Sequence, residues 1–258
     1  MSLPVSVAMA VYNGLPYLAA QLASVLSELR PDDELVVVDD HSTDGSLSFL
    51  QGLSDPRVIL LPNERNLGVR LSFERALGAC TRSIVLLCDQ DDVWVTGKRD
   101  AMVRPFMQDP RCTATVSDAE VVDGQGIVLS HSFMADRGGF KSGWWSTLIK
   151  NRYLGCCMAL RRDVVTLGLP IPAKVPMHDM WFGMLAAHCG RVTYVPRAYL
   201  HYRRHGRNVS PSHRAGIGQM LRWRWNLLTL VRRRLSDRST VRADVLTANE
   251  LDASDGRE

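Results

Sequence analysis

Two clusters of acidic residues follow short apolar runs in the N-terminal part of this 258-residue chain. Asp39 and Asp40 come after the apolar run at 35–38, and the run DQDD at 89–92 comes after the apolar run at 84–88. If both apolar runs are strands of an open α/β sheet, their carboxyl ends form the edge where such sheets bind ligands. Three carboxylates within residues 89–92 repel one another unless a cation or solvent compensates them. We therefore expect a divalent cation, Mn²⁺ or Mg²⁺, that also holds the phosphates of a substrate.

An isolated acidic run of this type is also typical of a solvated turn or of a Ca²⁺-binding loop. Its position directly after a wholly apolar strand favours a ligand site over both alternatives, because that position is the binding edge of the sheet.

The elements that must position these carboxylates alternate between strands and helices as far as about residue 110. Short apolar runs of strand length stand at 5–11, 35–38, 58–61 and 84–88. Helical spacing of apolar residues follows at 18–29 and 69–79. This alternation predicts an α/β fold with a Rossmann-like, mostly parallel central sheet and helices on both faces.

The second half of the chain is less regular. Residues 124–143 are rich in glycine and polar residues, and we interpret them as a mobile insertion near the site. Beyond them we expect a strand within 155–160, a helix at 180–188, and strands at 192–195 and 199–202.

Several segments together resemble the family 2 glycosyltransferases, which have the GT-A fold. The resemblance begins with VSVAMAVYNG at 5–14, VDDHSTDG at 38–45 and DQDD at 89–92. It continues in the expected order to about residue 210 with NLG at 66–68, GCCMALRR at 155–162, HDMW at 178–181 and YRRHGRN at 202–208. Members of the rhamnosyltransferase type, from bacterial polysaccharide assembly, are similar in having a His-Asp pair in the third of these later segments.

The resemblance implies an inverting, metal-dependent transfer of a sugar, with rhamnose as one candidate. The donor would be a dTDP or UDP sugar, and the acceptor a hydroxyl of a surface polysaccharide or lipid-linked glycan. Ala10 and Tyr12 would line the base pocket through their backbone, and Asp39 would hydrogen-bond the pyrimidine. Asp89 would lie near the ribose, and Asp91 would bind the metal. The other residues implied at the nucleotide sugar are Asn13, Asn66, Gly68 and Gln90.

The resemblance also implies a general base at Asp179, because an inverting transfer needs a carboxylate on the acceptor face, opposite the departing diphosphate. The residues assigned to the acceptor or sugar side are His178, Trp181, Asp92, Trp94, Gly155 and His201. Trp181 has two interpretations: it stacks on a sugar ring, or it anchors the helix as a core aromatic residue. Asp92 would orient a water molecule or a neighbouring side chain.

A histidine near the C-terminal end of the resemblance would contact the metal or the diphosphate. His205 occupies that place, but His201, four residues earlier, is an alternative, and a structural role remains open for either.

Residues 212–235 predict a basic amphipathic helix that extends the domain at 1–211. Its mixture of arginine, tryptophan and leucine suits an anionic membrane surface. Packing on the catalytic domain, or on a second subunit in a homodimer, is the alternative. Residues 236–258 are polar and predict a tail that is at least partly disordered.

The composition is that of a globular protein, with 46% hydrophobic and 22% charged residues. Its six cysteines show no CxxC spacing, which favours reduced thiols in the cytosol. The N-terminal residues do not resemble a signal peptide, and no apolar stretch approaches the ~20 residues that cross a bilayer as a helix. We therefore expect a cytoplasmic protein that meets a membrane only from the side, at its inner face.

Three other classes compete with the glycosyltransferase. A dinucleotide-dependent oxidoreductase would use Asp39 or Asp40 at the ribose, but the turn at 11–16 lacks the GxGxxG glycines. A sugar nucleotidyltransferase shares the nucleotide fold and an acidic metal site, but it gives no reason for the His178-Asp179 pair. Nucleic-acid binding through the arginine-rich end is at odds with the acidic strand ends.

Overall fold

The computed structural model describes residues 3–206 and 216–254. These residues form two compact units: one extends to residue 171 and resumes at 177, and the other consists of 172–176 with the long helix α8 (Ile217–Ser254). The expected boundary at 211 and the expected helix start at 212 lie outside the described residues. Within the described parts, no helix is both long enough and apolar enough to cross a membrane.

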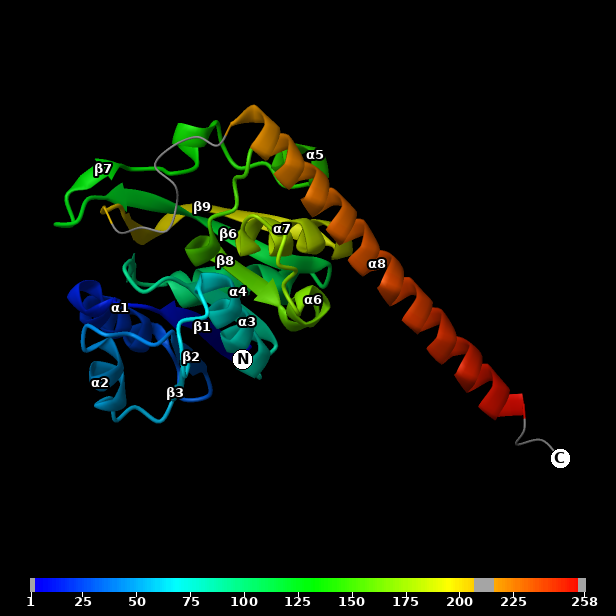
Figure 1. The fold of residues 1–258 in the computed structure, drawn as a ribbon, viewed down its shortest axis with the longest axis horizontal. Coiled ribbons are helices and arrows are strands. Elements are labelled where there is room, and N and C mark those ends of the chain that lie inside the picture. Colours follow the sequence, from blue (N-terminus) through cyan, green and yellow to red (C-terminus); the bar gives the residue numbers. More distant parts are fainter. Residues whose placement is uncertain (1–2, 207–215, 255–258) are drawn as a thin grey trace. The chain divides into compact units, whose positions relative to one another are not determined.

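The first unit is built on a nine-stranded sheet with the order β3-β2-β1-β4-β8-β6-β9-β5, and β7 pairs with β6 outside this path (Figure 1). Its strands are β1 (Val5–Val11), β2 (Glu34–Asp39), β3 (Val58–Pro62), β4 (Ile84–Cys88), β5 (Val93–Trp94), β6 (Cys112–Val122), β7 (Val128–Ser130), β8 (Met158–Arg161) and β9 (Arg191–Arg203). The strands β3, β2, β1 and β4 are parallel to one another, as are β6 and β9. The strands β8, β5 and β7 pair antiparallel with their neighbours. The α/β class with a mostly parallel central sheet is therefore confirmed, and the antiparallel pairs begin at β8.

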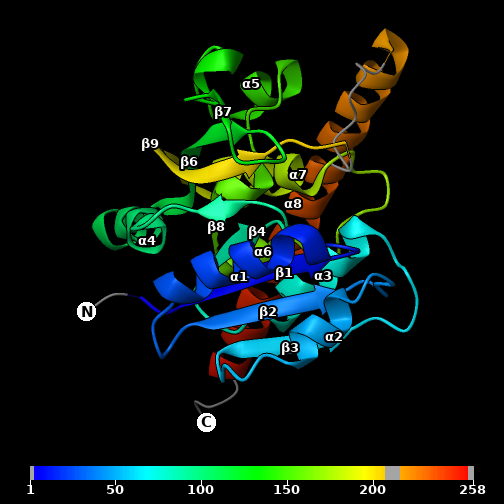
Figure 2. The ribbon, with the colours of Figure 1, turned by 90° about the vertical axis from the view of Figure 1, so that its left-hand side faces the viewer.

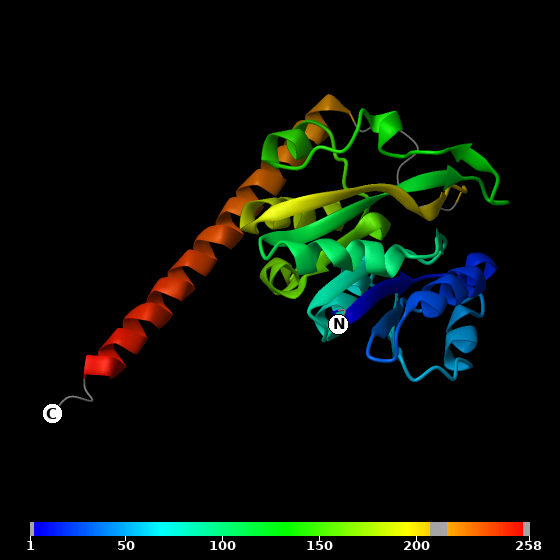
Figure 3. The ribbon, with the colours of Figure 1, turned by 180° about the vertical axis from the view of Figure 1, so that it is seen from behind.

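Helices cover both faces of this sheet. They are α1 (Leu15–Glu28), α2 (Ser46–Gln51), α3 (Val69–Ala79), α4 (Lys98–Gln108), α5 (Trp144–Ile149), α6 (Arg162–Gly168) and α7 (His178–Cys189), with short 3-10 helices η1 (Ala135–Arg137) and η2 (Gly155–Cys157). In Figure 1 the helices α3, α6 and α7 lie on the face toward the viewer, whereas α4 lies in front of the sheet in Figure 3. This two-sided covering explains why β1, β2 and β4 are almost wholly buried and read as continuous apolar runs.

The order of the first four strands places a binding edge between β1 and β4. The chain runs from β1 to β2 and β3 on one side, and then returns to β4 on the other side of β1. Ligands of open α/β sheets bind at such a reversal, outside the carboxyl ends of the strands. The acidic residues that follow β2 and β4 therefore meet on either side of the carboxyl end of β1.

Three sequence-based boundaries differ from the structure. The two strands expected at 192–195 and 199–202 are one strand, β9, whose pairing with β6 contains register shifts. The insertion at 124–143 contains β7 and η1. The helix α8 continues to Ser254, where the sequence predicted a polar tail from 236, and its residues 219–254 contain neither glycine nor proline to end it.

Candidate active site

The carboxyl ends of β1, β2 and β4 bring the N-terminal candidates together. Val11 pairs with Asp39 across β1 and β2, and Met9 pairs with Cys88 across β1 and β4. Ala10, which pairs with Val38, is partly exposed one position before the end of β1. The segments 10–14, 39–45 and 89–92 therefore surround one edge of the sheet.

One carboxylate oxygen of Asp39 accepts no hydrogen bond from the described residues. The residue is fully buried, and its Oδ1 accepts a hydrogen bond from the Ser42 backbone N–H at 3.0 Å. Its Oδ2 is buried and has no hydrogen-bond partner among the described residues. A buried carboxylate oxygen without a donor is costly, so this atom suits an N–H group of a bound ligand.

The Gln90 side chain holds the backbone of Tyr12. Its Oε1 accepts from the Tyr12 N–H at 2.7 Å, and its Nε2 donates to the Tyr12 carbonyl at 3.1 Å. A Cβ atom at Gly14 would lie 2.6 Å from Gln90 Oε1, so only glycine leaves room for this contact. The polar backbone groups of Tyr12, which we expected to line the base pocket, are thus occupied by Gln90, while the Tyr12 side chain is 47% exposed.

Asn13 and Asp40 shape the loops on either side of Asp39. Asn13 Oδ1 accepts from the Thr43 N–H at 2.8 Å, which ties the first turn to the loop after β2. Asp40 accepts from the backbone N–H groups of Leu67 and Gly68 at 2.7 and 2.8 Å. Gly68 has φ = +83°, a conformation that favours glycine.

These contacts assign Asp40 a structural role in the loop that contains the candidates Asn66 and Gly68. Asn66 is exposed in that loop.

Asp91 and His205 form a close pair. His205 Nε2 lies 2.8 Å from Asp91 Oδ2, and both side chains are largely buried. Tyr17 of α1 stacks on the imidazole, with ring centroids 4.7 Å apart. His201 instead lies 3.3 Å from the carboxylate of Glu120. Of the two candidate histidines, His205 is therefore the one at the acidic cluster, and Tyr17 is a neighbour that the sequence analysis missed.

The Asp91–His205 pair fits a divalent cation. Neighbouring ligands of an octahedral ion lie about 3 Å apart when the metal–ligand bonds are about 2.1 Å long. The 2.8 Å between Asp91 Oδ2 and His205 Nε2 is close to that separation. Carboxylate oxygen and imidazole nitrogen both suit Mn²⁺-type ions, and Mg²⁺ takes the carboxylate with substrate oxygens.

Asp89 and Asp92 form a second group with Cys156, whose candidate ligand atoms all lie within 4.8 Å of one another. Burial raises the pKa of the Cys156 thiol well above its usual range, so this sulfur stays protonated and is a poor ligand for a hard cation. Burial, followed by the charge of Asp91, raises the pKa of Asp89 to about 7. The pKa of Asp92 is also raised, by burial and then by Asp89, although its Oδ1 accepts from the Arg203 N–H at 2.9 Å. A bound cation would relieve this repulsion.

Asp179 lies in the first turn of α7 and is 4% exposed. Its Oδ1 accepts from the Met180 N–H at 2.6 Å, and its Oδ2 accepts from Asn151 Nδ2 at 3.4 Å. Burial raises its pKa to about 6, which suits a carboxylate that accepts a proton near neutral pH.

Asp179 belongs to the same site as the acidic cluster. The charges of Asp91 and Asp179 both act on Asp89. A Cβ atom at Gly155 would lie 3.8 Å from Asp179 Cβ, and the next residue, Cys156, borders Asp89 and Asp92. The short helix η2 therefore connects the cluster with the buried carboxylate of α7.

Two residues assigned to the acceptor or sugar side, Trp181 and Trp94, are core residues, and a third, His178, is partly buried. Trp181 is fully buried, and its Nε1 donates to the Gly168 carbonyl at 2.9 Å, which favours the interpretation that this residue anchors the helix. Trp94 is 4% exposed, with the Lys98 ammonium 4.7 Å from its ring centroid. His178 stacks on Phe73 at 4.4 Å, and burial lowers its pKa to about 4, so it is neutral.

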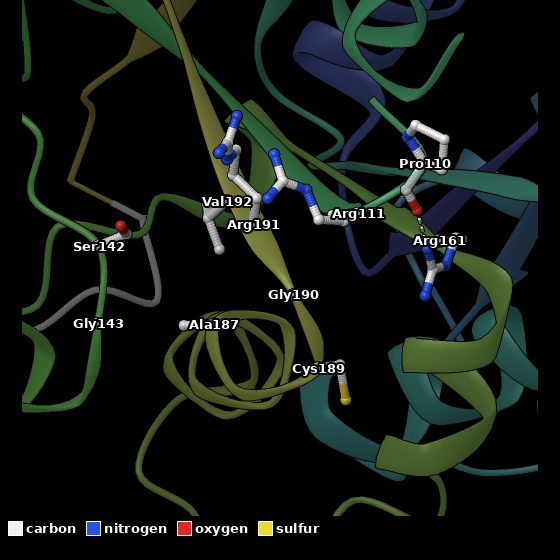
Figure 4. A pocket seen from close by; sticks show the side chains of 10 residues that line it. All are labelled: Pro110, Arg111, Ser142, Gly143, Arg161, Ala187, Cys189, Gly190, Arg191 and Val192. Carbon is white, nitrogen blue, oxygen red and sulfur yellow. Dashed lines mark hydrogen bonds between the residues drawn. The ribbon is translucent and has the colours of Figure 1, made fainter. Parts of the chain in front are cut away.

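A cavity of about 690 Å³ lies at the other ends of β6 and β9 and contains none of these candidates (Figure 4). Its cationic side chains are already paired. Arg111 and Arg191 contact Asp109, and Arg161 contacts Asp163.

The sheet order, with an acidic edge at the carboxyl ends of the parallel strands, is that of a GT-A fold. The same fold is present in the crystal structure of residues 1–349 of TarS from S. aureus with UDP-GlcNAc, with a TM-score of 0.67 at 20% identity over 90% of this chain and 66% of that one. GalNAc-T7 with UDP, GalNAc and Mn²⁺ matches with a TM-score of 0.62 at 18% identity, over 79% of this chain and 44% of that one.

Residues 6–167 match the model of glycosyl transferase family 2, and the chain belongs to this family. An uncharacterized glycosyltransferase of Nostoc sp. is 27% identical over 79% of this chain and 66% of its own length. The putative teichuronic acid biosynthesis glycosyltransferase TuaG of Bacillus subtilis is 29% identical over 70% of this chain and 71% of its own. The UDP-Glc:alpha-D-GlcNAc-diphosphoundecaprenol beta-1,3-glucosyltransferase WfgD of Escherichia coli is 27% identical over 59% and 57%. The match thus spans between 57% and 71% of the length of these relatives.

Proposed function

We propose that this chain is an inverting, metal-dependent glycosyltransferase. It takes a sugar from a nucleoside diphosphate and attaches it to a hydroxyl of a surface polysaccharide or lipid-linked glycan. The observation that carries the proposal is the convergence of the Asp91–His205 pair and the buried Asp179 on one site, connected by η2.

The proposed reaction needs no covalent intermediate. The acceptor oxygen attacks the anomeric carbon, the bond from that carbon to the phosphate oxygen breaks, and the nucleoside diphosphate leaves with the electron pair. Asp179 accepts the hydroxyl proton from the acceptor, and attack opposite the leaving group inverts the anomeric configuration. A divalent cation held by Asp91 and His205 would stabilise the negative charge of the diphosphate.

The donor is proposed to be a pyrimidine nucleotide sugar. Asp39 Oδ2, which has no donor among the described residues, suits the imino N–H of uracil or thymine. The relatives favour a UDP sugar, since WfgD is named for UDP-Glc and the TarS structure contains UDP-GlcNAc. A dTDP-linked rhamnose is the second donor to test.

The acceptor is proposed to be lipid-linked. WfgD is named for a diphosphoundecaprenol acceptor, and TuaG for teichuronic acid biosynthesis. Such an acceptor requires the protein to work at the inner face of the membrane. The basic helix α8, which exposes Leu221 and Trp225 one turn apart, is proposed to bind that surface, with a homodimer contact as the alternative. Truncation after residue 212 should weaken vesicle binding in the first case and abolish dimerisation in the second.

A donor panel tests the proposal. UDP-glucose, UDP-GlcNAc and dTDP-rhamnose are incubated with the protein, with and without Mn²⁺, while thermal stabilisation and nucleotide release are measured. We expect a metal-dependent release of UDP or dTDP, and a product with the anomeric configuration opposite to that of the donor. Release of pyrophosphate would instead identify a nucleotidyltransferase.

A further inference from the structure

Two elements of the first unit, β7 and α5, expose large apolar side chains. Ile127 and Leu129, just before and within β7, are 64% and 61% exposed. Trp145 and Ile149 of α5 are 77% and 72% exposed. We refer to these four side chains as the apolar rim. Soluble proteins seldom leave such groups of side chains uncovered unless they contact a partner or a membrane.

The exposed apolar side chains are grouped within each element. Ile127, Val128 and Leu129 are consecutive and are 64%, 41% and 61% exposed, and the pairing of β6 with β7 shifts in register beside them. Residues four apart in a helix lie one above the other, which applies to Trp145 and Ile149. Each element therefore presents a group of apolar side chains, rather than scattered single residues.

The two elements lie at the same end of the first unit. Figures 1 and 2, which are views at right angles about the vertical axis, both show β7 and α5 at the top, above β6 and β9, and Figure 1 shows the two elements well apart across that end. The end of α5 is held to η1, because Lys150 Nζ donates to the Arg137 carbonyl at 2.9 Å.

The charge around the apolar rim is positive. Residues 123–152 contain four basic side chains, Arg137, Lys141, Lys150 and Arg152, and two acidic side chains, Asp123 and Asp136. Lys141 and Lys150 are exposed on either side of α5. Exposed apolar side chains, one of them tryptophan, beside exposed lysines are the combination that an anionic lipid surface attracts. A protein partner without a net negative charge would give no reason for the excess of basic over acidic side chains.

The rim is close to the proposed catalytic base. Asn151, two residues after α5, donates to Asp179 Oδ2 at 3.4 Å, and the charges of Arg137 and Asp179 interact. A membrane in contact with the rim would therefore lie next to the acceptor side of the site.

We propose that the apolar rim, together with Lys141 and Lys150, binds the surface of an anionic membrane and presents Asp179 to acceptors anchored there. Ile127, Leu129, Trp145 and Ile149 enter the interfacial layer of the bilayer, and the two lysines contact anionic headgroups. The membrane contact is inferred from these side chains alone. Only its use for a lipid-linked acceptor rests on the proposed function.

The test is flotation of the full chain with vesicles of phosphatidylglycerol and phosphatidylcholine in equal parts, and with vesicles of phosphatidylcholine alone. The variant Ile127→Thr/Leu129→Thr keeps β-forming residues, and Trp145→Gln/Ile149→Gln keeps helix-forming ones. We expect each pair to weaken vesicle binding by at least about tenfold. Lys141→Gln/Lys150→Gln should weaken binding to the anionic vesicles by about fivefold per lysine, with little effect on the phosphatidylcholine vesicles.

Met107→Gln is the matched control, because Met107 is an apolar side chain of α4 that is 52% exposed away from the rim. Met107→Gln should bind vesicles like the unmodified chain. All variants should unfold at the same midpoint temperature as the unmodified chain. Vesicle binding that is unchanged in both rim variants, or absent from the unmodified chain, would overturn the proposal. A dimer in solution that the rim variants convert to a monomer would also overturn it, since the rim would then be a subunit interface. Because flotation needs neither donor nor turnover, its result is independent of the donor panel.

Discussion

His205 Nε2 lies 2.8 Å from Asp91 Oδ2, although 114 positions separate the two residues in the chain. The pairing of β5 with β9 produces this contact, because Val93 lies opposite His201 in an antiparallel register. Asp91, just before β5, therefore meets the segment that follows His201. Asp92 Oδ1, which accepts from the Arg203 N–H at 2.9 Å, strengthens the same junction.

We predict that His205→Ala raises the Mn²⁺ concentration required for half-maximal turnover by at least about tenfold, because one side chain at the cation is lost. The measurement is a Mn²⁺ titration of nucleotide release. His201→Ala is the control, since His201 contacts Glu120 instead and should leave the titration nearly unchanged. Equal effects of the two substitutions would contradict the assignment of His205 to the cation.

Asp179→Asn should lower turnover by ~10²–10⁴-fold, because the amide cannot accept the acceptor proton. The affinity for UDP, measured by calorimetry, should change little. In the unmodified enzyme the base must be ionised, and its pKa is raised to about 6 by burial. Turnover should therefore rise with pH through about 6, whereas an exposed aspartate would already be ionised well below that pH. A rate that stays constant across this range would remove Asp179 from the role of base.

The same substitution should stabilise the fold at alkaline pH. Burial favours the neutral form of Asp179, so the folded state has the higher pKa, about 6 against an ordinary 3.8. The contribution of Asp179 to the free energy of unfolding is therefore fully present below its ordinary pKa of 3.8, and it is lost as the pH rises through about 6. Asp179→Asn removes this loss, on the order of 3 kcal/mol at most. Urea unfolding at pH values above and below this range measures the effect, and an equal difference at both pH values would contradict it.

Gln90→Ala should raise the KM for the donor by about tenfold, because two hydrogen bonds to the Tyr12 backbone are lost. Gly14→Ala should act similarly, since its Cβ would lie 2.6 Å from Gln90 Oε1. Gln108→Ala, at an exposed position of α4, is the control. Initial rates at varied donor concentration distinguish the three variants, and normal kinetics in Gln90→Ala would show that this contact does not affect the donor site.

Asp40→Ala should destabilise the fold by about 2–4 kcal/mol, because it removes the acceptor of several N–H groups, among them those of Leu67 and Gly68. Urea unfolding gives the change in the free energy of unfolding. Asp32→Ala is the control, because Asp32 is exposed in the loop before β2. If both variants unfold alike, the Asp40 contacts add no net stability.

The elements that the sequence predicts best are the ones with purely local signals. The strands at 5–11 and 84–88 and the helix at 69–79 have the predicted bounds, because wholly apolar runs and helical spacing are properties of the segment itself. The strand β6 was missed, since polar side chains such as Thr113 and Thr115 interrupt its sequence. Both are buried in the fold, and their hydroxyl groups donate to the carbonyls of Ala186 in α7 and Met102 in α4, which the sequence of β6 does not reveal.

The sequence by itself determined the α/β class, the acidic strand ends and the family, because these depend on residue types in a fixed order. Only the tertiary structure decided that His205 rather than His201 meets Asp91, that Trp181 and Trp94 are core residues, and that Gln90 occupies the Tyr12 backbone. Each of these outcomes depends on which distant segment covers a side chain or supplies its hydrogen-bond partner. Strand pairing and helix packing set those neighbours, and the residues beside a side chain in sequence do not specify them.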